Sequence, residues 1–188
     1  MYQVLISLVT KIPLESELNK RNWQCTHTYH LLPKCPDVTG KEFFSEEEFL
    51  GVWYLQQSSV STKDTCVKYN FVNLTENIYV NISSNLIRNE SFEFKKYSQS
   101  IYLGVSTKFT FKGSSIYVVL DVDYDNYLLL WKCEHFYIFT RSIYFIFARK
   151  RLPNKRVLDQ AHSSLTNGKI KKKLILYKIK HDNCTSNV

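Results

Sequence analysis

The sequence predicts an all-β protein: an eight-stranded up-and-down antiparallel β-barrel, followed by one C-terminal α-helix and a short extra strand. Aromatic residues are abundant, with 13 Tyr, 12 Phe and 3 Trp, whereas Gly and Pro number only 5 and 4. Short runs of aromatic and β-branched residues, separated by brief turns, recur from Phe44 to Arg149. Eight strands in such a series leave two exposed edges unless the sheet closes, and closure into a barrel removes both.

The segments of strand character follow one another in the order that an up-and-down barrel requires. In FEFK and KFTFK, phenylalanines occupy one face and polar or charged residues the other, which is the period of a half-buried strand. Turn residues at 75–77 and 123–126 favour short hairpin connections. The predicted strands are 51–59, 66–74, 78–82, 92–97, 106–112, 116–122, 127–133 and 137–149.

The segment LPNKRVLDQAHSSL, residues 152–165, predicts a single amphipathic helix after the barrel. Pro153 stands near its start, where a missing N–H costs nothing, and Gly168 ends it. Apolar residues recur at helical spacing: Val157, Leu158, Ala161 and Leu165. The basic segment 171–180 then predicts the short extra strand.

A chain of 188 residues is most economically one domain with a sizeable core. We expect residues 1–34 to be a leader or a poorly ordered N-terminal segment, and residues 35–188 to form the barrel domain. Residues 2–9 are mostly apolar, but no positive charge precedes them and no small-residue cleavage site follows cleanly. No apolar run reaches the length of about 18 residues that a spanning helix needs.

The net charge of +8 points to an acidic partner, or to lysines that keep exposed strand edges solvated. Much of the excess lies near the C-terminus: Lys169, Lys171, Lys172, Lys173, Lys178 and Lys180. These lysines sit on a short terminal strand and are not interleaved with aromatic residues on a sheet face. Nucleic acid is therefore not an expected partner.

The five cysteines are widely and irregularly spaced, which favours long-range disulfides over a metal site. No CxxC pair and no Cys/His cluster of zinc-ligand spacing occurs, so neither a metal nor a cofactor is predicted. Sequons predict a glycoprotein made on an oxidising, secretory route. They begin at Asn73, Asn81, Asn89 and Asn183.

Three features follow one another in the chain: Gly51-Val52-Trp53 opens the first predicted strand, an acidic DY-containing turn at 123–127 joins the sixth and seventh, and Arg149 ends the eighth before the helix. In this order they resemble the lipocalin family. Val122 stands where that family's turn usually has threonine. The resemblance covers about residues 35–184. It implies that Trp53 lies across the closed bottom of the barrel, that Gly51 lets the backbone pass tightly there, and that Arg149 stacks over the indole ring.

The cysteine positions resemble the apolipoprotein D and Lazarillo branch of that family. Sequence alone allows three pairings of Cys35, Cys66, Cys133 and Cys184. The resemblance implies the pairs Cys35 with Cys133 and Cys66 with Cys184. Cys25 is left over, and three alternatives are open for it: a free thiol, a disulfide with another chain, or removal with a leader.

A hollow barrel of this family implies a cup for a small hydrophobic ligand: a fatty acid, a retinoid, a sterol or a bilin. Such pockets are mostly apolar with a few polar groups that orient the ligand. Tyr69 and Tyr127 are the candidates for those polar contacts. The residues expected to face inward are Leu55, Val67, Tyr69, Phe71, Ile78, Val80, Phe92, Phe94, Phe109, Phe111, Tyr127, Leu129, Ile143 and Phe145.

The function predicted from these observations is that of a secreted carrier of a small hydrophobic ligand. The alternative is an extracellular interaction protein, whose barrel rim or basic C-terminal strand binds a protein or an acidic membrane surface. No GxSxG, HExxH or Gly-rich phosphate loop occurs, and the histidines are scattered. Cys25, the one cysteine left over for a catalytic thiol, precedes the barrel and so cannot line the cup. We therefore expect no enzymatic activity and no catalytic residue.

Overall fold

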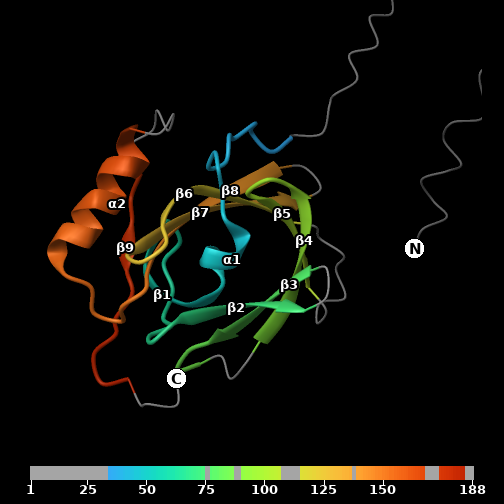
Figure 1. Cartoon of the computed structure of the whole chain (residues 1–188). Coiled ribbons are helices and arrows are strands. Elements are labelled where there is room, and N and C mark those ends of the chain that lie inside the picture. Colours follow the sequence, from blue (N-terminus) through green and yellow to red (C-terminus); the bar gives the residue numbers. More distant parts are fainter. Residues whose placement is uncertain are drawn as a thin grey trace, which may run out of the picture. The chain divides into compact units, whose positions relative to one another are not determined.

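Figure 1 shows the computed structural model, which describes residues 34–74, 77–86, 90–106, 115–136, 139–167 and 174–184. The predicted leader segment 1–34 therefore lies outside the described residues, apart from Lys34. Two helices are described, α1 (Glu46–Phe49) and α2 (Lys155–Asn167). The strands are β1 (Gly51–Ser58), β2 (Lys68–Leu74), β3 (Asn77–Ser83), β4 (Glu90–Ser98), β5 (Ile101–Ser106), β6 (Ser115–Asp123), β7 (Tyr127–Phe136), β8 (Phe139–Ala148) and β9 (Tyr177–Lys178).

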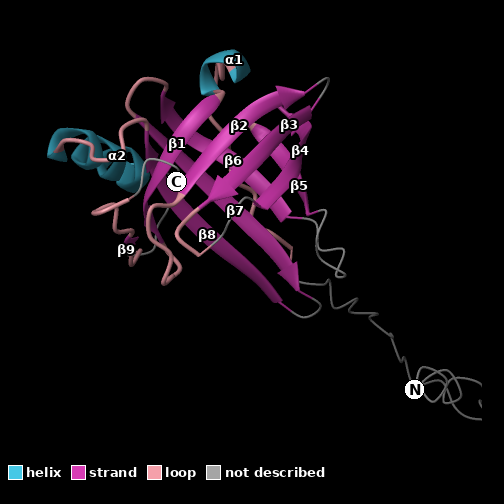
Figure 2. Ribbon diagram, turned by 90° about the horizontal axis from the view of Figure 1, so that it is seen from below, coloured by secondary structure: helices cyan, strands magenta, loops and turns pink. Residues whose placement is uncertain are grey.

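The eight long strands close into an antiparallel barrel, so the predicted fold class is confirmed. Each strand from β2 to β8 pairs with the next, and β1 pairs with β8 on one side and β2 on the other. Figures 1 and 2 show the resulting ring of strands with α2 on its outside. No strand between β1 and β8 is left with a fully open edge, which is the advantage that closure confers.

The extra strand β9 completes β1 where β2 no longer reaches it. Residues 51–54 of β1 pair with β2, whereas Gln57 and Ser58 pair with Lys178 and Tyr177 of β9. The amide of Ile179 donates to the carbonyl of Gln56 at 2.8 Å. The C-terminal segment thus fills a notch between β1 and β2 and is shorter as a strand than the predicted 171–180.

One further strand and one helix differ from the prediction. The predicted strand 106–112 lies outside the described residues from 107 onward, and β5 is instead Ile101–Ser106. The tight turn before β5 places Ser100 at φ 60°, and the strand contains Gly104, so the sequence lacks the alternation by which strands are recognised. The four-residue helix α1 was not predicted either, because one turn of helix has no periodicity to detect.

The predicted helix is confirmed as α2 and packs on the outer face of β6 to β8. Its first turn is capped by the Asn154 side chain, which accepts from the amide of Val157 at 3.0 Å. Its apolar stripe of Val157, Ala161 and Leu165 is buried against Leu129 and Ile146. This cover explains why β7 is apolar on both of its faces.

Two disulfides join distant parts of the barrel domain, in the pairing that the family resemblance implies. Cys35 is bonded to Cys133 of β7, with their Cα atoms 6.0 Å apart. Cys66 is bonded to Cys184, which ties the C-terminal segment to the start of β2. Cys25 lies outside the described residues. In the chain-entropy model, loops of about a hundred residues are each worth roughly 4–5 kcal/mol.

Among the described residues, no helix is both long and apolar enough to cross a bilayer.

Candidate functional site

The inner face of the barrel is built from every second residue of each strand. Directly opposed residues of antiparallel neighbours share a face, so the register identifies which side chains point inward. Lys132, for example, opposes Tyr117 on one side and Ile143 on the other. Of the residues predicted to face inward, the buried core of the lumen or its immediate packing contains Leu55, Val67, Tyr69, Phe71, Ile78, Val80, Phe92, Phe94 and Phe145.

Two of the predicted cavity residues face the other way. Tyr127 and Leu129 pack on the outside of the barrel against α2, and the inward-facing residues of β7 are Leu128, Leu130 and Lys132. The prediction was wrong because β7 is apolar on both faces, so its alternation does not show which side is inner. Phe109 and Phe111 lie outside the described residues.

One end of the barrel is closed by α1 and by Trp53. The Phe49 ring is fully buried, and its centre lies 4.5 Å from that of Phe71. The Trp53 indole N–H donates to the Phe49 carbonyl at 2.8 Å. Gly51 has φ 95°, and a Cβ there would lie 3.3 Å from the Arg149 guanidinium, so the position favours glycine on both counts.

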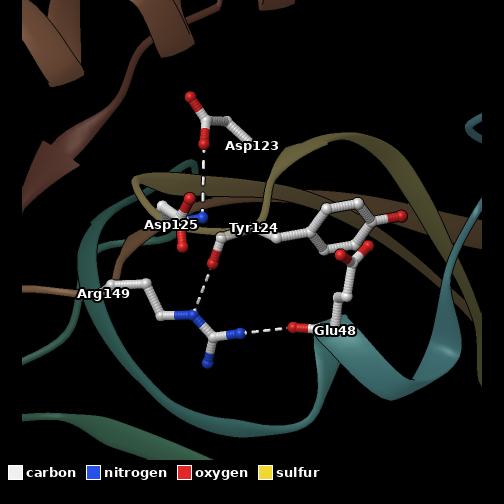
Figure 3. Close-up of a pocket in the computed structure, with 5 residues that line it drawn as sticks. All are labelled: Glu48, Asp123, Tyr124, Asp125 and Arg149. Atoms are coloured by element: carbon white, nitrogen blue, oxygen red, sulfur yellow. Dashed lines mark hydrogen bonds between the residues drawn. The ribbon is translucent and has the colours of Figure 1, made fainter.

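Arg149 fastens this floor from outside. Its guanidinium carbon lies 3.7 Å from the centre of the Trp53 ring. It donates to the carbonyls of Glu48 at 2.6 Å, Leu50 at 2.9 Å and Tyr124 at 2.7 Å. Figure 3 shows two of these bonds, together with Asp123 and Asp125 of the acidic turn. These residues line a hollow of about 610 Å³ on the outer side of the floor, which is separate from the lumen.

Aromatic rings fill the lower lumen above the floor. Phe94 and Tyr102 are fully buried, with ring centres 5.6 Å apart and nearly parallel planes. Phe71 lies 5.8 Å from Phe94, and Tyr117 lies 4.5 Å from it. The protein's own side chains therefore pack this part of the barrel.

The upper lumen is lined by side chains that are only partly buried. Tyr69, Ile82, Phe92 and Phe145 are half-buried residues packed against the core. Ile82 and Phe92 lie near the ends of β3 and β4 that are remote from the floor, whereas Tyr69 opposes Trp53 and Phe145 lies within β8. Their partial exposure distinguishes them from the fully buried rings below. This end of the lumen is therefore apolar and accessible to solvent.

Polar groups occur in the upper lumen beside these rings. The Lys132 ammonium lies 5.3 Å from the centre of the Tyr117 ring and 2.6 Å from a Glu134 carboxylate oxygen. Arg141 also binds Glu134, through its Nε at 2.9 Å. Burial alone would raise the pKa of Glu134, but hydrogen bonds and charges from Lys132 and Arg141 lower it overall.

Sequence reasoning missed this charged group, because a lysine or glutamate on a strand is normally placed outside. The register could have found it. The family resemblance places Arg149 against Trp53, and residues at even steps from it along β8 share its face. Ile143 and Arg141 are two of these, and they oppose Lys132 and Glu134 in the hairpin.

A second polar network lies outside the barrel, beneath α2. The Tyr127 hydroxyl donates to Asp121 at 2.7 Å and lies 2.9 Å from the Ser164 hydroxyl. Asp121 also accepts from Lys41 at 2.6 Å. Burial, with a contribution from Asp121, raises the pKa of Tyr127 to about 12, whereas Ser164 acts in the opposite direction. Tyr127 thus anchors the helix and does not line the lumen.

The other predicted surface features lie as follows. Asn73, Asn81 and Asn183 are exposed, as glycosylation requires, and Asn89 lies outside the described residues. Lys178 and Lys180 are exposed on and after β9. The lysines at 169 and 171–173 lie outside the described residues. In the described part of the chain, no group of three or more His, Cys, Asp or Glu side chains is placed to hold a metal ion.

The closed barrel, its Trp53–Arg149 floor and its outer helix define a lipocalin. No family model matches the sequence. The chain is 30% identical over 136 residues to apolipoprotein D from Cavia porcellus, a match that covers 66% of this chain and 71% of that relative. The chain therefore belongs to the lipocalin family and is similar to apolipoprotein D.

Solved structures of the same fold are more distant in sequence. Insecticyanin from the tobacco hornworm Manduca sexta has a TM-score of 0.63 at 14% identity, covering 81% of this chain and 88% of its own. A mutant of LTBP1 in complex with leukotriene C4 has a TM-score of 0.55 at 20% identity, covering 76% of this chain and 90% of its own. At these identities the similarity establishes the fold alone.

Proposed function

We propose that this chain is a secreted carrier that binds one small hydrophobic ligand in the upper lumen. The observation that carries the proposal is the contrast between the two ends of the barrel. The lower end is closed by the fully buried Phe49 and Trp53, whereas Ile82 and Phe92 near the other end are apolar and partly exposed. An apolar lumen open at one end is the arrangement of a ligand cup.

The family assignment supports a binding protein and not an enzyme. The relative that shows the family is an apolipoprotein, and the LTBP1 structure of the same fold holds leukotriene C4. Both names point to amphipathic or apolar small molecules. For this chain the proposed ligand class is the one expected from the sequence: a fatty acid, a retinoid, a sterol or a bilin.

Secretion is supported by the covalent features of the barrel domain. Two disulfides persist in oxidising compartments and are rare in the cytosol. Three of the predicted glycosylation sites, Asn73, Asn81 and Asn183, are exposed. A glycan analysis of the protein secreted from cultured eukaryotic cells tests this part of the proposal.

Binding is tested by titrating the purified protein with retinol, palmitate and biliverdin while following intrinsic fluorescence. Trp53 forms the floor of the lumen, so a ligand inside the barrel can quench or shift its emission. The expected result is saturable quenching with a stoichiometry of about one ligand per chain for at least one of the three.

Two variants of β3 distinguish a ligand bound inside the barrel from one bound outside it. Ile82→Trp enlarges an inward-facing side chain of β3 and should weaken binding at least tenfold by filling the upper lumen. Tyr79→Trp is the matched control, because Tyr79 points to the other face of the same strand. Equal effects of the two variants would contradict a lumenal site.

The alternative function rests on the C-terminal segment. Ile175 and Tyr177 are 68% and 44% exposed beside the basic residues Lys178 and Lys180, which is a surface that a protein or an acidic membrane could contact. Retention on heparin or on acidic lipid vesicles, together with no response to any of the three ligands, supports this alternative over the carrier.

A further inference from the structure

Three charged side chains meet inside the upper barrel. Lys132 and Glu134 of β7 form an ion pair at 2.6 Å, and Arg141 of β8 binds the second oxygen of the same carboxylate at 2.5 Å. The Lys132 and Glu134 side chains are only 19% and 18% exposed. Burial makes charged groups costly unless they are paired, so the balance of charge within this cluster matters.

Lys132 and Arg141 both bind the carboxylate of Glu134, one at each of its oxygens. Arg141 is 49% exposed and Lys132 only 19%, so Lys132 is the more deeply buried of the two cations. Two other carboxylates are close enough to affect Tyr69. Of these, Glu90 is exposed and Asp64 accepts from the Ser84 hydroxyl at 3.0 Å.

Lys132 is accompanied by two phenols. Its ammonium lies over the Tyr117 ring, and it interacts electrostatically with Tyr69 across the lumen. Burial raises the pKa of both hydroxyls. Tyr117 raises the pKa of Tyr69 further, and Glu134 raises that of Tyr117 further, so both phenols stay protonated at neutral pH. A neutral phenol can donate a hydrogen bond to an anion. Lys132 and Tyr117 lie beside the partly exposed ring of Phe92, whose centre is 5.8 Å from that of Tyr117.

We propose that Lys132 binds the carboxylate head group of an amphipathic ligand whose hydrocarbon chain lies in the lumen. The inference rests on the proposed carrier function and names its ligand class: long-chain carboxylic acids, in preference to neutral molecules of the same length. Lys132 has three N–H donors and gives one to Glu134, so it can hold the resident and the incoming carboxylate together. Tyr117, whose ring lies 5.3 Å from the Lys132 ammonium, donates to the same head group.

The test compares hexadecanoic acid with 1-hexadecanol, which differ in the head group and not in chain length. Binding of each radiolabelled compound is measured by equilibrium dialysis at pH 7.4, at concentrations below its solubility limit. The wild-type protein should bind the acid at least about tenfold more tightly than the alcohol, the effect of one charge-assisted hydrogen bond. Lys132→Met should abolish this preference and leave the affinity for the alcohol unchanged.

A control variant and a variant that should strengthen binding of the acid complete the test. Lys68→Met removes a lysine from the outer face of β2 and should keep the wild-type preference, since its neighbour Tyr69 faces inward. Glu134→Gln removes the competing carboxylate and should strengthen binding of the acid about threefold to tenfold, with no gain for the alcohol. A merely structural ion pair would not produce that gain.

The outcomes separate the two proposals. Equal wild-type affinity for the acid and the alcohol overturns the head-group inference and leaves the carrier function standing. Loss of both ligands to the same extent in Lys132→Met, while the variant keeps its circular dichroism spectrum, also overturns it. Binding of neither compound by the wild-type protein overturns both the inference and a lumenal carrier of this ligand class.

Discussion

Arg149 lies over Trp53, with its guanidinium carbon 3.7 Å from the centre of the ring, and the pair joins the end of β8 to the start of β1. The same guanidinium donates to backbone carbonyls on both sides of the floor, including Glu48 before β1 and Tyr124 in the turn between β6 and β7. One side chain therefore fixes three chain segments that come together only in the closed barrel.

Arg149→Lys should lower the free energy of unfolding by about 3 kcal/mol, because a single ammonium cannot reach carbonyls that a planar guanidinium bonds simultaneously. Urea unfolding followed by circular dichroism measures the loss. Arg156→Lys, on the exposed side of α2, is the matched control and should change stability by less than about 0.5 kcal/mol. A loss of similar size in the control would contradict a special role for Arg149.

Removing the Cys66–Cys184 disulfide by a double substitution to serine should cost about 4–5 kcal/mol, and the loss should begin at the C-terminal segment. That segment is held to β1 by the bond from the Ile179 amide to the Gln56 carbonyl. Hydrogen exchange should show this amide exposed before the rest of the barrel opens. The Cys35→Ser/Cys133→Ser variant is the comparison, in which the Ile179 amide should stay protected until global unfolding.

Stability should fall as the pH drops from about 7 to 5 because His181 is buried. Burial lowers its pKa, against the effect of its hydrogen bond to the Leu55 carbonyl at 2.7 Å. The unfolded chain therefore binds a proton near pH 6.5, before the folded chain does, so the free energy of unfolding decreases as pH falls through this range. Among the described residues, its Nδ1 has no hydrogen-bond partner, so protonation would bury an unpaired donor.

Urea unfolding at pH 7.5, 6.5 and 5.5 measures this dependence. His181→Gln should flatten it, whereas His162→Gln, on α2, should leave it as in the wild type. An unchanged slope in His181→Gln would show that another group causes the acid sensitivity.

Gly104→Ala should destabilise the protein by about 1–3 kcal/mol through overpacking of the lumen. A Cβ at this position would lie 2.4 Å from the Tyr117 ring, and that ring is itself wedged against Phe94. Urea unfolding gives the size of the loss, and near-ultraviolet circular dichroism should report the displaced rings. Ser115→Ala is the control at the opposing register position and should leave both measurements nearly unchanged.

The fold was predictable wherever a local pattern and its environment agreed. Phenylalanine alternation at Phe92 and Phe94 identified β4 and its inner face, and the stripe Val157, Ala161 and Leu165 identified α2. In both cases one face meets the core and the other meets solvent, so hydrophobicity alone gives the orientation.

The candidate site was less predictable, because its environment is created by other segments. β7 is covered by the lumen on one side and by α2 on the other, so Leu128 and Leu129 look equivalent in the sequence. Lys132 faces inward against its usual preference because Glu134, two residues along the same strand, pairs with it there. Its position follows from the pairing of β7 with β8, a relationship that no local pattern contains.

The notch between β1 and β2 determines which part of the barrel folds last during synthesis. All the hairpins from β2 to β8 are contiguous in sequence and can form as they leave the ribosome, but the seam beside Gln56 stays open until residues 177–184 have been made. The nascent chain thus presents an unpaired strand edge throughout most of its synthesis. Formation of the Cys66–Cys184 disulfide, in which an oxidant of the folding compartment takes two electrons from the two thiols, then fixes this last segment to the barrel.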